Sequence, residues 1–470
     1  MISLKNKKVL VFGLGVQGGG VATTNWLLKH GAKVTVTDLK TKKELARSLA
    51  NIKGSVKLRL DGHDVNDIAK SDVVVINPDV PLTSDYVRFA FDQGKAVENE
   101  ATLFYRYWQK PIIGVSGTRG KTTTSHWINH FLSAKFKSSV AGNSHDYPFL
   151  KVLDKQNRLD IAVTEMPSFH LELFDRTNLK PHTAVITNIY HDHFNRYSIY
   201  EKYVKAKSNL YVNQTDTDDL ILNFDNRWTP ALRARNIQPR LWYFSLKKIP
   251  ERSRGLFFQY GYGVFHDNDN VKRALDLRTF ANKWGNHNVE NVLTASLAAH
   301  VAGIEWYDIQ RLIQSLPQVP YRQEVVFDNG TLKIINDTTA TSPEGSIAAV
   351  KRFGSPTTIL ITGGTDRNLM FENWGKIVSS FVIPENIIFL AGSATDKMIY
   401  ALKHTKHTFE KYETLETCIQ AALMKAANYP DATIVFSPGS KSFEKFKNEY
   451  DRGERFNKLI KKFTRKNPKS

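Results

Sequence analysis

The stretch PIIGVSGTRGKTT, residues 111–123, decides the fold of the chain around it. A run of β-branched residues leads into a glycine turn, and a helical pattern follows over residues 124–132. This strand–loop–helix order predicts a parallel α/β sheet with a loop whose amides cradle phosphates. Lys121 is placed to neutralise phosphate charge, and the hydroxyl of Thr122 to ligate Mg²⁺. Val115 stands where the full phosphate-loop pattern has a glycine, but the setting still predicts a site for ATP.

A second glycine turn, GLGVQG at residues 13–18, follows a strand-like run at 8–12 and opens a helical segment. Asp38 ends the next strand-like run. This spacing is typical of dinucleotide sites, where helix-end amides face a diphosphate. Taken alone, this turn fits an NAD-dependent dehydrogenase, or a turn that only packs a helix on a strand. The predicted ATP loop further along the chain counts against the dehydrogenase. The candidate residues here are Gly15, Val16, Gln17 and Asp38.

The alternation of strand, polar turn and helix recurs along the chain and predicts parallel α/β sheets throughout. It separates into three blocks, 1–108, 109–317 and 318–470. Residues 238–277 are short-patterned, aromatic and glycine-rich, which indicates a β-ribbon. The predicted strands are 8–12, 33–37 and 72–76 in the first block; 111–115, 160–164, 183–187 and 220–223 in the second; and 333–335, 358–361, 387–390 and 432–436 in the third.

Composition narrows the class of protein. The 470 residues, 41% of them hydrophobic, predict several domains with proper cores and exclude global disorder. The single cysteine, Cys418, excludes a disulfide framework. No apolar run approaches a membrane span of roughly 20 residues, and the N-terminus has no signal-peptide core, so we expect a cytoplasmic protein with no membrane insertion. The formal charge of +19 is dispersed, apart from a basic tail at 452–470 that reads as a helix, and we expect no nucleic-acid partner.

Acidic and histidine side chains follow two of the predicted strands. Glu165 comes directly after the strand at 160–164, and His193 comes shortly after the strand at 183–187. The carboxyl ends of parallel strands meet at one edge of a sheet, so we expect these side chains beside the phosphate loop. A carboxylate and an imidazole in that position are plausible metal ligands.

Two helical patterns further along carry polar residues. Lys205 and Lys207 have a spacing that, taken alone, favours an exposed basic face. Asn288 and Asn291 lie one helical turn apart and share a face that can reach an adenine edge.

A series of short motifs spans nearly the whole chain, from Gly13 to Phe456. They are GTRGKTT (117–123), EMPSF (165–169), NIYHDH (188–193), YVKAK (203–207), NHNVEN (286–291), YRQE (321–324) and NDTTAT (336–341). In this order they resemble the Mur ligase family. The tail, FSPGSKSF at 436–443 followed by DRG at 451–453, is similar to that of the members that add D-glutamate.

The resemblance implies an α/β chain of three domains. The first is Rossmann-like and binds UDP-N-acetylmuramoyl-L-alanine, the second is a phosphate-loop ATPase with a parallel sheet, and the third is Rossmann-like and delivers D-glutamate. ATP phosphorylates the substrate carboxylate, the amine attacks the acyl phosphate, and ADP and phosphate are released during peptidoglycan precursor synthesis. Two Mg²⁺ ions and a monomeric chain are also expected.

The resemblance assigns a role to each matching residue. Lys121, Lys207 and His193 are the expected catalytic residues. ATP is held by Gly117, Thr118, Arg119, Gly120, Lys121, Thr122 and Thr123, together with Asn288, Asn291, Arg322 and Asp337. One Mg²⁺ is served by Thr122 and Glu165, and the other by His193 and a carbamylated Lys207. Substrate contacts are expected from Gly15, Val16, Gln17, Asp38, Asn143, Ser168 and His170 for the nucleotide sugar, and from Thr341, Arg367 and Ser442 for the amino acid.

Several positions depart from the family pattern. They are Asp79 near the expected uridine site, His170 in the PSFH run, Thr339 for a lysine of some members, Glu449 for an aromatic residue, and Arg367 for a lysine. Arg367 keeps the charge and offers bidentate carboxylate binding. A related ligase with another amino acid or acceptor is therefore an alternative, and a non-catalytic nucleotide-sugar-binding module is a more distant one.

Overall fold

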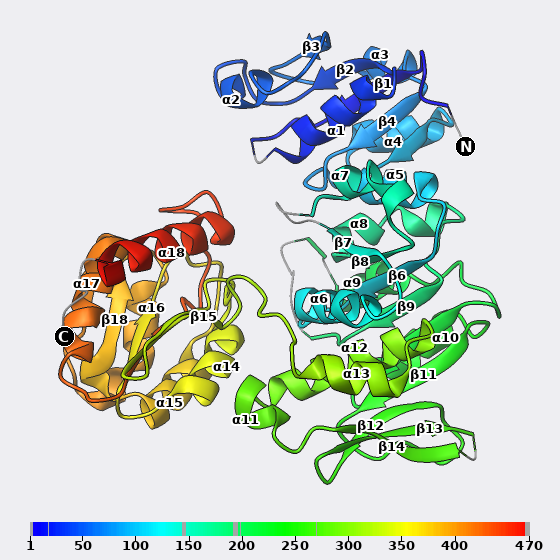
Figure 1. Cartoon of the computed structure of the whole chain (residues 1–470). Helices are drawn as coiled ribbons and strands as arrows, with labels where there is room; N and C mark the ends of the chain where they lie inside the picture. Colours follow the sequence, from blue (N-terminus) through cyan, green and yellow to red (C-terminus); the bar gives the residue numbers. More distant parts are fainter. Residues whose placement is uncertain are drawn as a thin grey trace. The chain divides into compact units, whose positions relative to one another are not determined.

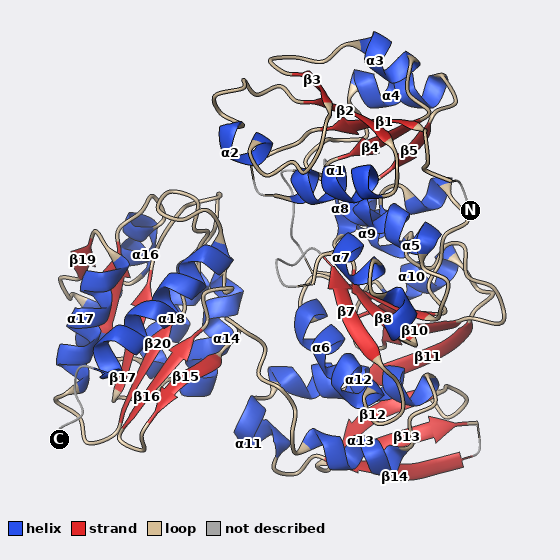
Figure 2. Cartoon of the chain, turned by 45° about the horizontal axis from the view of Figure 1, so that its top comes forward, coloured by secondary structure: helices blue, strands red, loops and turns tan. Residues whose placement is uncertain are grey.

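The computed structural model of the chain describes residues 3–16, 18–142, 147–190, 196–197, 199–268 and 270–465 (Figure 1). The chain forms two compact units, Met1–Pro317 and Gln318–Ser470. The first unit contains two sheets and the second contains one. Within each unit helices pack against the strands, as the colouring of Figure 2 shows.

The first sheet is entirely parallel, with the order β3-β2-β1-β4-β5. Its strand order reverses beside β1, and such a switch point is where open α/β sheets bind ligands. The glycine turn at 13–18 follows β1 and therefore lies at this point. The strands are β1 (Lys8–Phe12), β2 (Lys33–Thr37), β3 (Lys57–Arg59), β4 (Val73–Ile76) and β5 (Ala96–Glu98); the helices are α1 (Gly19–Lys29), α2 (Ala46–Leu49), α3 (Val65–Ala69), α4 (Asp85–Asp92) and α5 (Glu100–Tyr107).

The second sheet has nine strands in the order β14-β13-β12-β11-β10-β9-β6-β8-β7. The strands from β6 to β12 pair in parallel, whereas β12, β13 and β14 pair antiparallel at one edge. The strands are β6 (Ile112–Ser116), β7 (Ser138–Gly142), β8 (Ile161–Glu165), β9 (Thr183–Ile186), β10 (Asp219–Asn223), β11 (Arg240–Ser245), β12 (Gly255–Gln259), β13 (Tyr262–Asp267) and β14 (Asn270–Asp276). The helices are α6 (Lys121–Leu132), α7 (Phe149–Leu153), α8 (Ser168–Leu171), α9 (Tyr200–Ser208), α10 (Thr229–Arg235), α11 (Phe280–Trp284), α12 (His287–Val301) and α13 (Trp306–Ile313).

The sheet of the second unit has the order β15-β16-β20-β17-β18-β19 and is parallel except for β15. Its two faces carry separate hydrophobic cores because alternate strand residues point to opposite sides: Ile334 belongs to one core and Ile335 to the other. The strands are β15 (Glu324–Asp328), β16 (Leu332–Asn336), β17 (Thr358–Thr362), β18 (Ile387–Leu390), β19 (Glu410–Tyr412) and β20 (Ala432–Phe436); the helices are α14 (Pro343–Phe353), α15 (Glu372–Phe381), α16 (Thr395–Ala401), α17 (Leu415–Ala426) and α18 (Glu449–Arg465).

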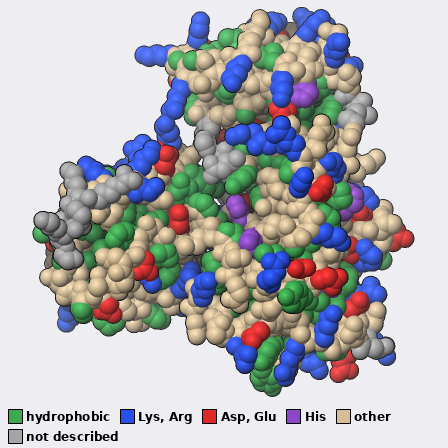
Figure 3. Space-filling view, viewed as in Figure 1, with side chains coloured by type: hydrophobic (Ala, Val, Ile, Leu, Met, Phe, Trp, Pro, Cys, Tyr) green, Lys and Arg blue, Asp and Glu red, His purple; other side chains and the backbone are tan. Residues whose placement is uncertain are grey.

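The predicted α/β class with three sheets rich in parallel strands is confirmed. The expected β-ribbon over 238–277 is present as β12–β14, but β11 extends the parallel part of the sheet. The basic tail forms α18, which begins earlier than expected, at Glu449. Among the described residues no helix is both long and apolar enough to cross a bilayer. Lys and Arg side chains are scattered over the face shown in Figure 3.

Candidate active site

The phosphate loop between β6 and α6 needs glycine at two positions. Gly117 and Gly120 have φ angles of 141° and 79°, which L side chains rarely adopt. A Cβ atom on Gly117 would lie 1.9 Å from Oγ1 of Thr187, and one on Gly120 would lie 2.3 Å from Oδ1 of Asn291. Either substitution would therefore displace the loop from the strand end and helix that support it.

The end of strand β9 fixes the shape of this loop. Asn188 accepts the amide of Thr118 on its carbonyl oxygen and the amide of Arg119 on its side-chain oxygen, both at 2.9 Å. Thr187 donates its hydroxyl to the carbonyl of Arg119 at 2.7 Å. The amides of Thr118 and Arg119 are thus engaged within the chain. The first turn of α6, which includes Thr122 and Thr123, has no side-chain cap in the part that the structure describes, so its amides are suited to an anion.

Two lysine ammonium groups converge on this loop. Lys121 donates to the carbonyl oxygens of Gly117 and Thr118 at 3.0 and 3.2 Å. Lys207, from helix α9, donates to the same Gly117 oxygen at 2.7 Å and is only 2% exposed. The loop therefore carries two positive charges beside the place where phosphates are expected.

The burial of Lys207 corrects the expectation of an exposed basic face. Lys205 is exposed and forms an ion pair with Asp175 at 3.6 Å, whereas Lys207 turns inward under the ring of Tyr203, with Nζ 4.7 Å from its centroid. The hydroxyl of Tyr203 lies 3.0 Å from Oγ1 of Thr118. Helix α9 thus contacts the phosphate loop through two residues.

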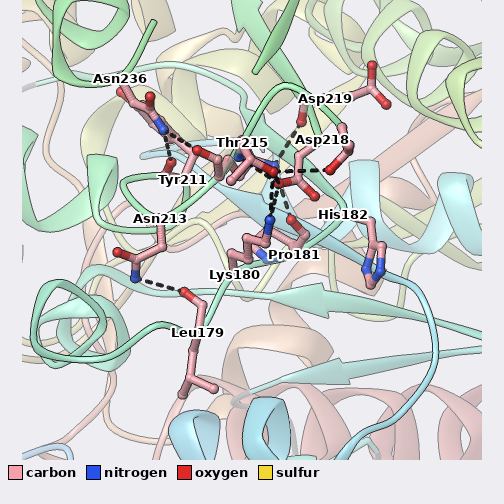
Figure 4. Close-up of polar contacts among 12 residues, drawn as sticks. Leu179, Lys180, Pro181, His182, Tyr211, Asn213, Thr215, Asp218, Asp219 and Asn236 are labelled. Carbon is pink, nitrogen blue, oxygen red and sulfur yellow. Dashed lines mark hydrogen bonds and ion pairs between the residues drawn. The ribbon is translucent and has the colours of Figure 1, made fainter. Parts of the chain in front are cut away.

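The chain that follows α9 is held to the segment that precedes β9 by an amide side chain and an ion pair (Figure 4). Asn213 donates to three carbonyl oxygens, those of Phe174, Thr177 and Leu179, at 2.6–3.1 Å. Lys180 pairs with Asp218 at 2.5 Å. These contacts fix the C-terminal side of α9, and with it the helix that presents Lys207.

A hydroxyl and a carboxylate meet beside the loop. Thr122, at the start of α6, donates to Oε1 of Glu165 at the end of β8, with 3.0 Å between the two oxygens. Oxygen ligands of this kind suit Mg²⁺, so the pair fits one metal site. In the described residues no cluster of three or more acidic, histidine or cysteine side chains is suited to hold a metal. His193 lies outside the described residues, as do Gln17 and Asn143.

Asn288 and Asn291 join a chain of hydrogen bonds that supports the loop. Asn291 donates to Oδ1 of Asn288 at 2.8 Å, and Asn288 donates to the carbonyl of Trp284 at 2.7 Å. Thr124 donates to Asn291 at 3.4 Å. The predicted adenine contacts remain predictions; what the structure shows is that Asn291 packs directly on Gly120.

In the first sheet Asp38 holds the glycine turn itself. Its two carboxylate oxygens accept the amides of Gly15 and Lys40, each at 2.9 Å, and the residue is 5% exposed. Val16, at the tip of the turn, is 57% exposed. The close helix–strand contact is made by Gly20, where a Cβ atom would lie 2.2 Å from the carbonyl oxygen of Leu14.

Ser168 and His170, on the short helix α8, are both buried. His170 is 0% exposed, and neither of its ring nitrogens has a hydrogen-bond partner in the described part of the chain. Burial lowers the pKa of His170 from 6.5 to about 3. In this structure the imidazole is enclosed beside Phe149 and Phe169, so it does not present the surface that a sugar contact requires.

We expect His170→Leu to stabilise the chain more at pH 5 than at pH 8. The unfolded chain takes up a proton on His170 below its ordinary pKa of 6.5, whereas the folded chain stays neutral down to about 3, so wild-type stability is lost as the pH falls. At pH 5 this loss is about 2 kcal/mol in the free energy of unfolding, and leucine abolishes it. Urea unfolding at both pH values measures the difference. An equal gain at both would assign the effect to packing alone.

In the second unit Asp337 is enclosed. Its carboxylate accepts the hydroxyl of Ser437 at 2.7 Å and the amide of Gln323 at 3.1 Å. Burial raises its pKa from 3.8 to about 7, against the opposing charges of Arg322 and Arg352. A carboxyl group with such a pKa is partly protonated near neutral pH, and in that form it can donate a hydrogen bond to a ligand hydroxyl.

The expected amino-acid contacts lie in loops of the same unit. Thr341 accepts a hydrogen bond from Lys441 at 3.2 Å, and Arg367 lies over the ring of Phe443, 5.2 Å from its centroid. The hydroxyl of Ser442 is buried and has no partner among the residues described. Lys441 was not among the predicted site residues, although it lies inside the 436–443 motif. Its neighbour Thr341 is a hundred residues away, so nothing local marked it.

This arrangement defines a class of α/β proteins that bind a nucleoside triphosphate at a phosphate loop. Residues 115–299 match the family model described as Mur ligase middle domain, and residues 7–98 match Mur ligase MurD-like, N-terminal domain. The chain belongs to the Mur ligase family.

The relatives are similar over their full length. A protein of Roseiflexus sp. (strain RS-1) named UDP-N-acetylmuramoylalanine–D-glutamate ligase is 33% identical over 98% of this chain and 100% of its own. A protein of the same name from Borreliella afzelii (strain PKo) is 31% identical over 97% and 98%. In fold the chain is similar to a crystal structure of MurF from Acinetobacter baumannii, with a TM-score of 0.61, 16% identity and 91% of each chain covered.

Proposed function

We propose that the chain is an ATP-dependent ligase that adds D-glutamate to UDP-N-acetylmuramoyl-L-alanine during peptidoglycan precursor synthesis. The observation that carries the proposal is the convergence of Lys121 and Lys207 on one carbonyl oxygen of the phosphate loop. The full-length similarity to relatives with this name supports the same substrates.

The reaction needs an activated carboxylate. A carboxylate oxygen attacks the γ-phosphorus of ATP, the bond between that phosphorus and the bridging oxygen breaks, and ADP leaves. The glutamate nitrogen then attacks the acyl carbon, the acyl carbon–oxygen bond breaks, and phosphate leaves while the nitrogen loses a proton. Phosphorylation supplies the leaving group that a free carboxylate lacks. Negative charge on phosphate oxygens must be balanced in both steps, which is the role of Lys121.

Metal ions have a fitting place in this scheme. Thr122 and Glu165 would hold one Mg²⁺, and His193 with a carbamylated Lys207 would hold a second. Bound Mg²⁺ supplies positive charge at the phosphates. The segments 1–108, 109–317 and 318–470 would then bind the nucleotide sugar, ATP and the amino acid, with Thr341, Arg367 and Ser442 as contacts for the last.

A phosphate-release assay with UDP-N-acetylmuramoyl-L-alanine, ATP, Mg²⁺ and a panel of D- and L-amino acids tests the proposal. We expect release that depends on all four components and is fastest with D-glutamate. Preference for another amino acid would instead identify a related ligase. Tight binding of NAD without binding of ATP would contradict the ligase reading altogether.

A further inference from the structure

The carboxyl ends of three neighbouring strands form one edge of the sheet in the second unit. Strands β16, β20 and β17 lie side by side and are parallel, so the loops at 337–342, 437–442 and 363–367 leave the sheet at the same edge. Ligands of open α/β sheets bind at such an edge. Thr341, Ser442 and Arg367, the proposed amino-acid contacts, each come from a different one of these loops.

The backbone of Lys441 pairs with the 363–367 loop, and its side chain contacts the 337–342 loop. Its amide and carbonyl pair with the carbonyl and amide of Thr365 at 3.2 and 2.9 Å. Its ammonium donates to Oγ1 of Thr341 at 3.2 Å. The ammonium is therefore held beside a proposed substrate contact by backbone bonds that leave the side chain half-buried.

A buried guanidinium fastens the same loops together. Arg452, on α18, is 0% exposed and donates to the carbonyl oxygens of Thr338, Ser440 and Lys441 at 2.7, 3.2 and 3.2 Å. Each bond goes to a loop at the sheet edge. The position of Lys441 relative to Thr341 is thus determined by the fold before any ligand arrives.

Two cationic side chains lie at this edge. Neither Lys441 nor Arg367 forms an ion pair with any residue that the structure describes. Of the nearby carboxylates, Asp366 pairs with Lys397 at 2.5 Å, and Glu444 accepts the amide of Ser393 at 3.0 Å. Two cations and the unpartnered hydroxyl of Ser442 make this edge suited to a ligand with two anionic groups.

A dicarboxylic amino acid is such a ligand. When its amine becomes acylated, both carboxylates remain charged, and each needs a positive partner. We propose that Lys441 binds the second carboxylate of the amino acid and so selects a dicarboxylic substrate, while Arg367 binds the first. This rests on the proposed function. Thr339, which replaces a lysine of some family members, donates its hydroxyl to the carbonyl of Tyr321 at 2.8 Å and supplies no charge, whereas Lys441 supplies one from the neighbouring loop.

Steady-state kinetics of Lys441→Met tests the inference. We expect KM for D-glutamate to rise about 10- to 100-fold, as for the loss of one charge-assisted hydrogen bond, with KM for ATP and for the nucleotide sugar unchanged. The preference for D-glutamate over D-glutamine, measured as a ratio of kcat/KM, should fall about 10-fold or more. Lys441→Arg should retain most of that preference. Lys445→Met is the matched control, because Lys445 pairs with Glu413 at 2.8 Å and should change neither quantity.

The two proposals fail in different ways. If wild type releases phosphate with D-glutamate and Lys441→Met keeps both its KM for D-glutamate and its preference over D-glutamine, the inference about Lys441 is overturned and the ligase function stands. If wild type shows no D-glutamate-dependent release, the proposed function itself is overturned. A melting temperature for each variant shows whether the fold is retained.

Discussion

Lys121→Ala is expected to abolish amino-acid-dependent formation of ADP, with kcat falling by about 10³-fold or more. The ammonium of Lys121 donates to the carbonyl oxygens of Gly117 and Thr118. It therefore lies within the phosphate loop, next to the N-terminus of α6. When a phosphoryl group is transferred, charge develops on its oxygens, and a fixed cation stabilises that charge more than mobile water does. The measurement is a coupled assay of ADP under saturating ATP, nucleotide sugar and D-glutamate.

Lys135→Ala is the matched control for Lys121. Lys135 follows the other end of the same helix and is exposed. Among the described residues its side chain contacts the carbonyl of Gly303, at 3.4 Å, and the ring of Phe136. It should keep the wild-type rate of ADP formation. Equal rates of ADP formation in Lys121→Ala and in wild type would contradict a catalytic role for Lys121 in the phosphate loop.

The phosphate loop was predictable because its information is local. The apolar run of β6, the two glycines and the helical pattern after Lys121 are adjacent in sequence, and each constrains the backbone on its own. Gly117 and Gly120 are required by positive φ angles, which the Gly-x-x-Gly spacing already indicated. The buried strands such as β6 and β20 were predictable for the same reason, since parallel strands buried on both faces are continuous apolar runs. The sequence did not predict β3, β5, β7, β15 and β19, which are short or partly exposed.

The environment of Lys207 could not be predicted in this way. Its spacing from Lys205 on a short helix is equally compatible with two exposed lysines, and what buries it is a contact with Gly117, ninety residues earlier in the chain. Asp38 is a second case: its place after β2 suggested a ligand contact, which remains a prediction, and the structure adds that both carboxylate oxygens hold the turn. In both cases tertiary contacts decide the role, and a pattern of neighbouring residues does not contain them.

The site in the second unit depends on register. Thr341 and Lys441 are brought together because β16 and β20 pair in parallel, with Asn336 opposite Phe436, so the loops that follow leave the sheet level with each other. A shift of one residue in that pairing would move the side chains of one strand to the opposite face of the sheet and separate Thr341 from Lys441. The motifs 336–341 and 436–443 marked the two loops, and only the sheet shows which side chains of each meet.

Lys207→Ala is expected to reduce kcat for ADP formation by about 10³-fold, with partial recovery in added formate or acetate. The amine donates to the carbonyl of Gly117 at 2.7 Å. A carbamate made from this amine and CO₂ would keep one N–H to continue that bond, and its carboxylate-like group would be suited to hold Mg²⁺. A short carboxylate that diffuses into the space left by alanine replaces those oxygens, and the rate then rises with carboxylate concentration.

Lys207→Arg separates a carbamate from a simple cation. Arginine keeps the positive charge but does not add CO₂, so the carbamate mechanism predicts an inactive variant, while a requirement for charge alone predicts an active one. Lys205→Ala is the matched control, because Lys205 is exposed two residues away and pairs only with Asp175 among the described residues. In wild type, ¹³C-labelled bicarbonate should give a carbamate resonance that Lys207→Arg lacks. An active arginine variant together with no carbamate signal in wild type would show that Lys207 acts as an ammonium group, like Lys121, because arginine keeps the positive charge and N–H donors of lysine but does not add CO₂.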